Sequence, residues 1–135
     1  MTSHTENHCQ ARRHVRSASP WEDLIGFSRA VRVGDTIHVA GSGPVWPDGS
    51  FDPDPHVQAA RCFAIGAAAL AELGASLDDV VRTRMFVTSD AVIDAVGRAH
   101  HAAVGHVAPA ATLVIVAGLD DPRWVVEVEL DAVVR

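Results

Sequence analysis

The stretch PAATLVIVAGL, residues 109–119, is apolar at nearly every position and carries no ionisable side chain. The next segment, WVVEVELDAVV at 124–134, alternates apolar residues with Glu127, Glu129 and Asp131. A fully apolar strand is typical of burial on both faces, whereas strict alternation is typical of a strand with two different faces. These two strands therefore predict a sheet that is covered on both sides, with carboxylates in one of the layers.

The rest of the chain alternates between strand and helix patterns. Two alternating runs flank Gly34 and Asp35, a turn signal that predicts a hairpin. An alanine-rich run with helical spacing follows, and Asp54 before Pro55 and Gly74 at the end are typical helix boundaries. The predicted elements are strands at 28–33 and 36–42, a helix from Pro55 to Gly74, a strand within 79–89, a helix from Ser89 or Asp90 to Gly105, and strands at 110–118 and 123–134.

The length of 135 residues suits one domain with a core of its own. Residues 1–19 are polar and predict a tail that ends in a possible edge strand at RHVRSA, residues 13–18. Residues 20–135 then form the domain. No segment is long and apolar enough to span a membrane, and the first residues do not resemble a signal peptide.

The charge pattern excludes several classes of function. All 11 basic residues are arginine and there are 17 acidic residues, so the net charge is -6 and a nucleic-acid partner is not expected. A chain without lysine cannot form a Schiff base or a P-loop. Cys9 and Cys62 show no disulfide or metal-binding spacing, so we expect a cytoplasmic protein with no metal.

Two helices can cover only one face of the predicted sheet, so the other face needs a different cover. A second copy of the chain is the simplest one, and we expect an obligate homo-oligomer. The acidic row of the last strand would then face the interface, where Arg82 and Arg84 have the matching period to pair with it. A cleft between subunits with such charges is a natural place for a small-molecule ligand.

Four segments together resemble the RidA/YjgF family, some of whose members carry an endoribonuclease L-PSP label. They are GFSRAVRVGDTIHVAG, GASLDDVVRTRMFVT, PAAT and VEVELDAV. The resemblance implies an α+β, chorismate-mutase-like fold: a six-stranded mixed sheet with two helices on one face, assembled as a homotrimer. It also implies hydrolysis, without a cofactor, of reactive enamines and imines left by pyridoxal-phosphate enzymes.

Typical deaminases of this family bind the substrate carboxylate through an arginine that follows Pro-Ala. The resemblance places Ala111 at that position, and Thr112 and Leu113 stand where a serine and often a cysteine follow. Loss of one partner of a buried charge pair costs about 2 to 5 kcal/mol of binding. We therefore expect a pocket at the subunit interface that is retained but takes an altered substrate.

The remaining pocket positions are only partly matched. Phe27 stands in place of a tyrosine, Ala40 in place of a serine, and Glu127 matches the glutamate that positions or activates water. Glu127 is accordingly the predicted catalytic residue, with a structural ion pair as the alternative. Arg84 is a candidate substitute cation for the substrate, and its alternative role is to neutralise Glu129 or Asp131.

The sequence leaves two functions open. One is a deaminase-type hydrolase with an altered substrate, and the other is a non-catalytic trimeric binder or sensor of a small molecule. RNA cleavage is disfavoured by the acidic charge and by the absence of lysine. His100 and His101 point about 100° apart on a helix and complete no metal-binding spacing, so we expect packed or half-exposed histidines there.

Overall fold

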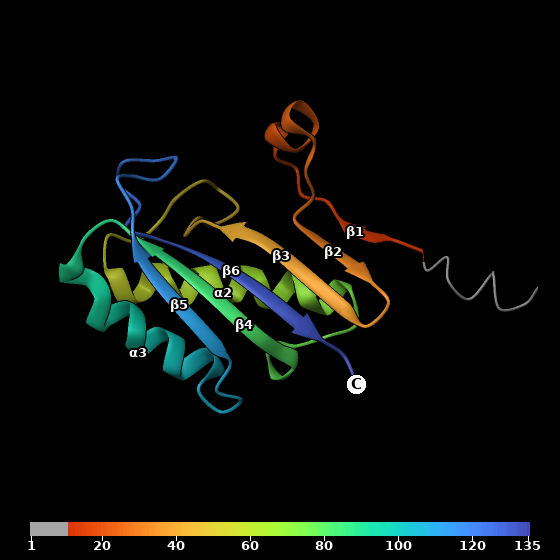
Figure 1. Cartoon of the computed structure of the whole chain (residues 1–135). Coiled ribbons are helices and arrows are strands. Elements are labelled where there is room, and N and C mark those ends of the chain that lie inside the picture. The colour runs from red at the N-terminus through yellow and green to blue at the C-terminus, as the bar shows by residue number, and fades with distance from the viewer. Residues whose placement is uncertain (1–10) are drawn as a thin grey trace, which may run out of the picture.

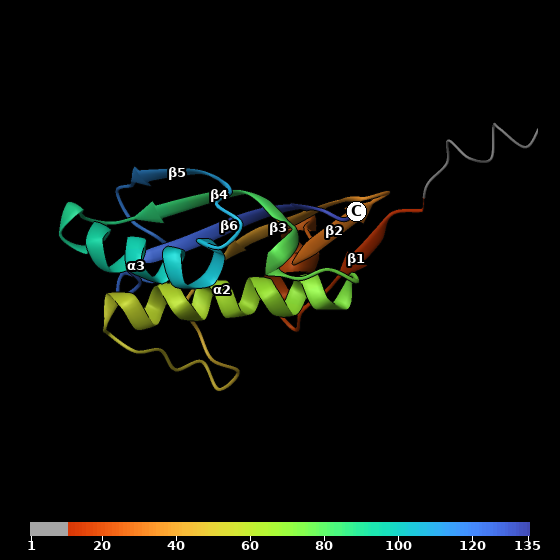
Figure 2. The same cartoon turned by 90° about the horizontal axis from the view of Figure 1, so that it is seen from below.

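Residues 11–135 form one β-sheet backed by two long helices, in a computed structural model that describes this part of the chain. Figure 2 shows α2 (Pro55–Glu72) and α3 (Ile93–Val104) together on one side of the sheet. The strand order is β1-β2-β3-β6-β4-β5, and within residues 11–135 only the β4–β5 pair is parallel (Figure 1). The strands are β1 (Arg13–Val15), β2 (Ala30–Val33), β3 (Thr36–Ser42), β4 (Val80–Val87), β5 (Ala110–Ile115) and β6 (Val126–Val133). This is the predicted α+β arrangement.

The helix α2 begins and ends where its sequence signals indicate. The Asp54 side chain accepts hydrogen bonds from the backbone N–H groups of His56, at 2.8 Å, and Val57, at 3.2 Å. Gly74, just beyond the helix, has a φ of +81°, which a residue with a Cβ rarely adopts. Gly66 lets α2 approach the sheet closely, because a Cβ there would lie 2.5 Å from Cδ1 of Leu130.

The core lies between the helices and the sheet face that they cover. Alternate residues of β6 point into it, and Val126, Val128 and Leu130 are almost fully buried. Phe63 of α2 and Val96 of α3 pack from the helix side. The opposite face of the sheet has no covering element within residues 11–135 (Figure 2). None of the helices in this range is long and apolar enough to cross a membrane.

Two short helical turns, η1 (Glu22–Gly26) and η2 (Leu77–Asp79), were not predicted, since each is too brief to show a periodic pattern. A third turn, η3 (Asp90–Val92), begins at the predicted helix start and runs directly into α3. The predicted polar tail is described only from residue 11 onward, so Cys9 lies outside the described residues. Within the tail, β1 pairs with β2 at the edge of the sheet.

The charge-free strand β5 is an edge strand of the sheet and is largely exposed in a single chain. Val114 and Ile115 are 41% and 56% exposed, and Leu113 alone of the strand packs against the core. The helices do not extend over the strand's other residues. Its apolar composition therefore has no explanation inside one protomer.

Candidate functional site

The uncovered face of the sheet carries a charged network built by β3, β4 and β6. The Arg84 guanidinium lies 3.0 Å from Asp131 and 3.7 Å from Glu129. His38 of β3 contacts the other oxygen of Asp131 at 2.7 Å. The predicted ion pair of Arg84 with these acids is confirmed, and its suggested role in substrate binding stays a prediction.

Arg82 connects this network to the edge strand. Its Nη2 donates a hydrogen bond of 2.7 Å to the Thr112 hydroxyl, which lies on the same face because Arg84 and Thr112 are paired in register. Nε of Arg82 is buried and has no hydrogen-bond partner among the described residues. Thr112 therefore acts as an acceptor for β4 rather than as a free hydroxyl.

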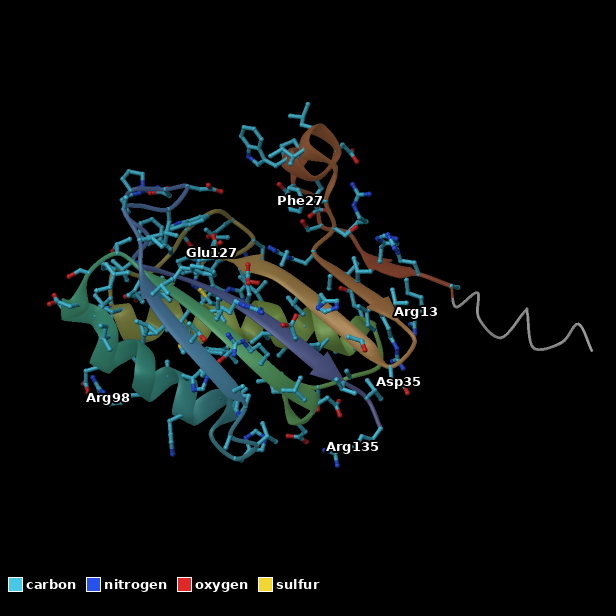
Figure 3. All side chains as sticks on the ribbon, viewed as in Figure 1. Arg13, Phe27, Asp35, Arg98, Glu127 and Arg135 are labelled. Atoms are coloured by element: carbon cyan, nitrogen blue, oxygen red, sulfur yellow. The ribbon has the colours of Figure 1, made fainter. Side chains whose placement is uncertain are left out.

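Glu127 lies near the start of β6 (Figure 3), on the same face as Asp131 and four residues before it. It pairs in register with Phe86 of β4, and its carboxyl group lies against Gly41 of β3. A bulge between Val39 and Ser42 shifts the register there, and a Cβ on Gly41 would lie 2.9 Å from Cδ of Glu127. The absence of a side chain at position 41 thus makes the room that the carboxyl group occupies.

The environment of Glu127 favours its protonated form. Burial raises the pKa of the Glu127 carboxyl, the negative charge of Asp120 raises it further, and the positive charge of Arg29 partly opposes both. A raised pKa makes the ionised carboxyl group a stronger base than an ordinary glutamate. Glu127 is therefore suited to take a proton from water or from a ligand.

Arg29 is a second charged residue at this end of the face. Its backbone carbonyl accepts a hydrogen bond from Ala40 N–H at 2.9 Å, and its Nη2 donates to the Gly41 carbonyl. Its Nε is buried without a partner, and no carboxylate of the described residues forms a salt bridge with it at 4.0 Å or less. Burial lowers the pKa of the Arg29 guanidinium, and the charges of Glu22 and Glu127 oppose this effect.

Two further predicted pocket residues are Phe27 and Ala40. Ala40 is partly buried beside Gly41, on the strand that Arg29 contacts. Phe27 follows η1 directly and is 36% exposed (Figure 3). The η1 turn is anchored by the buried Glu22, which accepts hydrogen bonds from Arg16 Nε and Ser17 N–H, each at 3.0 Å.

Ala111 is far from Glu127 within one chain, and Leu113 packs against the core. Ala111 pairs with Thr83 on β4, whereas Glu127 pairs with Phe86, three residues further along the same strand. Three residues and two strand spacings separate the two Cα atoms by roughly 14 Å. Their partners Thr83 and Phe86 are an odd number of residues apart on β4, so Ala111 and Glu127 point to opposite faces of the sheet. Ala111 and Glu127 of one protomer therefore cannot bind the same small molecule.

Two hollows on the surface of residues 11–135 are lined by residues other than Glu127. A groove of about 700 Å³ lies at the start of β5, where its lining includes Asp79, Ala110 and Arg135. A shallower hollow of about 550 Å³ is formed by the loop at Trp46.

The histidines expected to be structural have identifiable contacts. His100 Nε2 lies 2.8 Å from the Thr83 hydroxyl, and its ring meets Phe63 edge-on at 5.7 Å. Burial lowers the pKa of the His100 imidazole, and the nearby His101 adds to the effect. Among residues 11–135, no group of three or more His, Cys, Asp or Glu side chains is arranged to hold a metal ion.

Sequence reasoning missed Arg29 and Gly41. A usable signal was present in the hairpin, because pairing Ala30 with Val39 places Arg29 opposite Ala40 and therefore beside Gly41. What the hairpin pattern alone could not supply is the bulge at Gly41, which brings Glu127 of β6 against the same residue.

Comparisons with known proteins agree on one family. The family model described as Endoribonuclease L-PSP matches residues 19–134. An uncharacterized protein of Streptomyces coelicolor is 40% identical over 124 residues, which cover 91% of this chain and 92% of the relative. The crystal structure of Rv2704 from Mycobacterium tuberculosis, a member of the YjgF/YER057c/UK114 family, is 37% identical with a TM-score of 0.84, covering 92% of this chain and 100% of that one. RidA from a Psychrobacter species is 25% identical with a TM-score of 0.77, covering 90% and 94%.

Proposed function

The chain belongs to the endoribonuclease L-PSP family, which includes the YjgF and RidA proteins, and from this premise we propose that it hydrolyses an enamine- or imine-like metabolite. The observation that carries the proposal is Glu127, a partly buried carboxyl group with a raised pKa on an uncovered face of the sheet. A group of this kind is suited to orient a water molecule and to take a proton from it.

The proposed reaction is the addition of water to a carbon–nitrogen double bond. Glu127 accepts a proton from water as the oxygen bonds to the imine carbon and the carbon–nitrogen π bond opens, and it passes this proton to the nitrogen to give a carbinolamine. The hydroxyl proton of the carbinolamine then moves to the nitrogen through Glu127 as the carbon–nitrogen bond breaks, so that ammonia leaves, a carbonyl compound remains and Glu127 is ionised again. An enamine enters the same path after its tautomerisation to the imine. No oxidant, reductant or metal is consumed.

We propose that the pocket is completed by a neighbouring subunit of a homotrimer. Two features support this: the uncovered face of the sheet and the exposed apolar residues of β5. The separation of Ala111 from Glu127 also fits an assembly in which these two positions come from different chains. We include a cytoplasmic location in the proposal, supported by Cys62, a buried free thiol.

The substrate is proposed to differ from that of typical deaminases of the family. Ala111 is exposed and carries no charge, so the edge strand itself offers no partner for a carboxylate. The same observation favours the second candidate function, a trimeric small-molecule binder or sensor without turnover. The two candidates differ in one measurable property, the release of ammonia.

The deciding experiment measures ammonia released from imines that an amino-acid oxidase generates in situ. The wild-type protein is expected to accelerate release over buffer, and Glu127→Gln is expected to lower the rate about 100-fold or more. Asp94→Asn is the matched control, because Asp94 is an exposed carboxylate on α3 that pairs only with Arg98 in the described residues. No acceleration by the wild type across a panel of amino acids would remove the hydrolase and leave the binder.

A further inference from the structure

We propose that Arg29 is a positioning residue for Glu127: it fixes the bulge of β3 at Gly41, and the bulge fixes the Glu127 carboxyl group. The role of this arrangement in catalysis rests on the proposed function, whereas the effect of Arg29 on the Glu127 carboxyl group does not require turnover. In this role Arg29 acts through the protein and contacts no reacting atom.

The first support is the way in which Arg29 holds the bulge. The register of β3 with β6 shifts between Val39 and Ser42, and Ala40 and Gly41 lie in that shift. Arg29 binds both of them, since its backbone carbonyl accepts from the Ala40 N–H at 2.9 Å and its Nη2 donates to the Gly41 carbonyl. A bulged residue lacks its regular partner in the ladder, so these two hydrogen bonds determine where the bulge lies.

The second support is the contact between the bulge and Glu127. A Cβ on Gly41 would lie 2.9 Å from Cδ of Glu127 and 3.3 Å from its Cγ, so the side chain rests along the Cα of Gly41. A shift of the Gly41 backbone would therefore either push the carboxyl group away or open a gap beside it. Arg29 thus controls the position of Glu127 through the residue that lies between them.

The third support is that the Arg29 guanidinium is turned toward the protein. Its Nε is buried, and its Nη2 is bonded to the Gly41 carbonyl. Burial lowers the pKa of the guanidinium, and the charges of Glu22 and Glu127 oppose this effect. Glu22 is itself buried and is held by Arg16 and Ser17. A fixed negative charge therefore accompanies the guanidinium inside the protein, as a buried cation requires.

Arg29 also affects the charge balance around Glu127. The groups that act on this carboxyl group or respond to it are Arg29 before β2, Asp120 in the loop before β6, Glu129 on β6 and the Cys62 thiol on α2. Burial, Asp120 and Glu129 raise the pKa of Glu127, whereas Arg29 lowers it. The Cys62 thiol stays uncharged, because burial raises its pKa to about 12. Removal of Arg29 would therefore raise the pKa of Glu127 further.

The test follows the titration of Glu127 by carboxyl-carbon NMR in the full-length chain, with the signal assigned by its absence in Glu127→Gln. Arg29→Gln and Arg29→Met are expected to move the titration midpoint to higher pH, because both lack the positive charge. Arg29→Lys keeps the charge and is expected to lie nearer to the wild type. Arg98→Gln, on the exposed surface of α3, is the control and should leave the midpoint unchanged.

Kinetics of ammonia release separate position from charge. The acidic limb of the pH profile of kcat should move together with the Glu127 titration. On the alkaline plateau, where Glu127 is ionised in every variant, Arg29→Gln and Arg29→Met should still lower kcat about 10-fold or more, because the base is displaced. KM should change less than about 2-fold, since a residue that does not bind the substrate leaves ground-state binding intact.

Several results would overturn the proposal. They are an unchanged Glu127 titration in both uncharged variants, a wild-type plateau kcat in both, or a raised KM with an unchanged kcat, which would make Arg29 a ligand-binding residue. Thermal unfolding identifies a variant that fails to fold. If Arg29→Gln fails, Arg29→Met decides, because it fills the same space without an unpaired polar group. Unfolding of both would assign Arg29 to the fold alone and refute the proposal. If the wild type releases no ammonia, the hydrolase is refuted and the titration still decides this inference.

Discussion

The carboxyl group of Glu127 lies directly against the Cα of Gly41, so that even a methyl group at position 41 would collide with it. Gly41→Ala is therefore expected to displace Glu127, and misplacement by about 1 Å can lower a catalysed rate about 100-fold. The rate of ammonia release checks this. Gly97→Ala is the control, since a Cβ there meets no atom within 4 Å. Equal rates in the two variants would show that the position of Glu127 does not matter.

The raised pKa of Glu127 predicts a stability that falls with pH. Burial raises the pKa above its usual value of 4.5, so the folded state holds this proton more tightly than the unfolded state does. The loss of folding stability that comes from ionising the buried Glu127 is absent below pH 4.5 and grows as pH rises through the folded-state pKa. Glu127→Gln removes this penalty, so its melting temperature should exceed that of the wild type by a margin that widens with pH. A margin that is constant from pH 4 to 8 would contradict the shift.

The ion pair of Arg84 with Asp131 reports whether the open face is covered. In an isolated chain their side chains are 41% and 23% exposed, and breaking such a pair costs about 1 kcal/mol or less. In a subunit interface the same change leaves buried acids unpaired and costs about 3 to 5 kcal/mol. We expect the larger loss for Arg84→Gln, measured by denaturant unfolding at two protein concentrations, together with dissociation in sedimentation. A small, concentration-independent loss would indicate a monomer with an exposed face.

The close approach of Gly66 on α2 to Leu130 on β6 predicts opposite effects for two helical glycines. Alanine favours a helix over glycine by about 1 kcal/mol, so Gly97→Ala on α3 should stabilise the protein. At Gly66 the added Cβ would lie 2.5 Å from Leu130 Cδ1, and overpacking costs about 1 to 3 kcal/mol. Gly66→Ala should therefore be neutral or destabilising in thermal unfolding. Stabilisation by both variants would mean that Leu130 moves aside without cost.

The sequence was sufficient for the elements and their order because their signals are local. Asp54 and Gly74 mark the ends of α2, and the alternation of Glu127 and Glu129 with valines fixes which side of β6 meets the helices. The pairing of Arg84 with Asp131 followed from matching periods on two strands. These inferences need only the spacing of residues along one strand or helix.

The parts that could not be predicted depend on how distant segments meet. The bulge at Gly41 brings Arg29 and Glu127 to the same residue, yet nothing in either segment alone indicates it. The edge position of β5 is likewise decided by its parallel pairing with β4. The apolar composition of β5 predicted burial on both faces but not its place at the edge of the sheet, where Val114 and Ile115 are exposed in one chain.

Restoring an arginine at position 111 tests whether the pocket spans two chains. Ala111 is exposed on an edge strand, so Ala111→Arg should fold without repacking. Because Ala111 and Glu127 lie on opposite faces and far apart in one protomer, a new guanidinium can assist Glu127 only across an interface. We expect faster ammonia release from carboxylated imines, and a loss of this gain when Arg84→Gln is added to disrupt the assembly. Ala110→Arg, which projects from the other face of β5, is the matched control. A gain that persists in dilute monomer, or an equal gain from Ala110→Arg, would contradict a pocket shared between subunits.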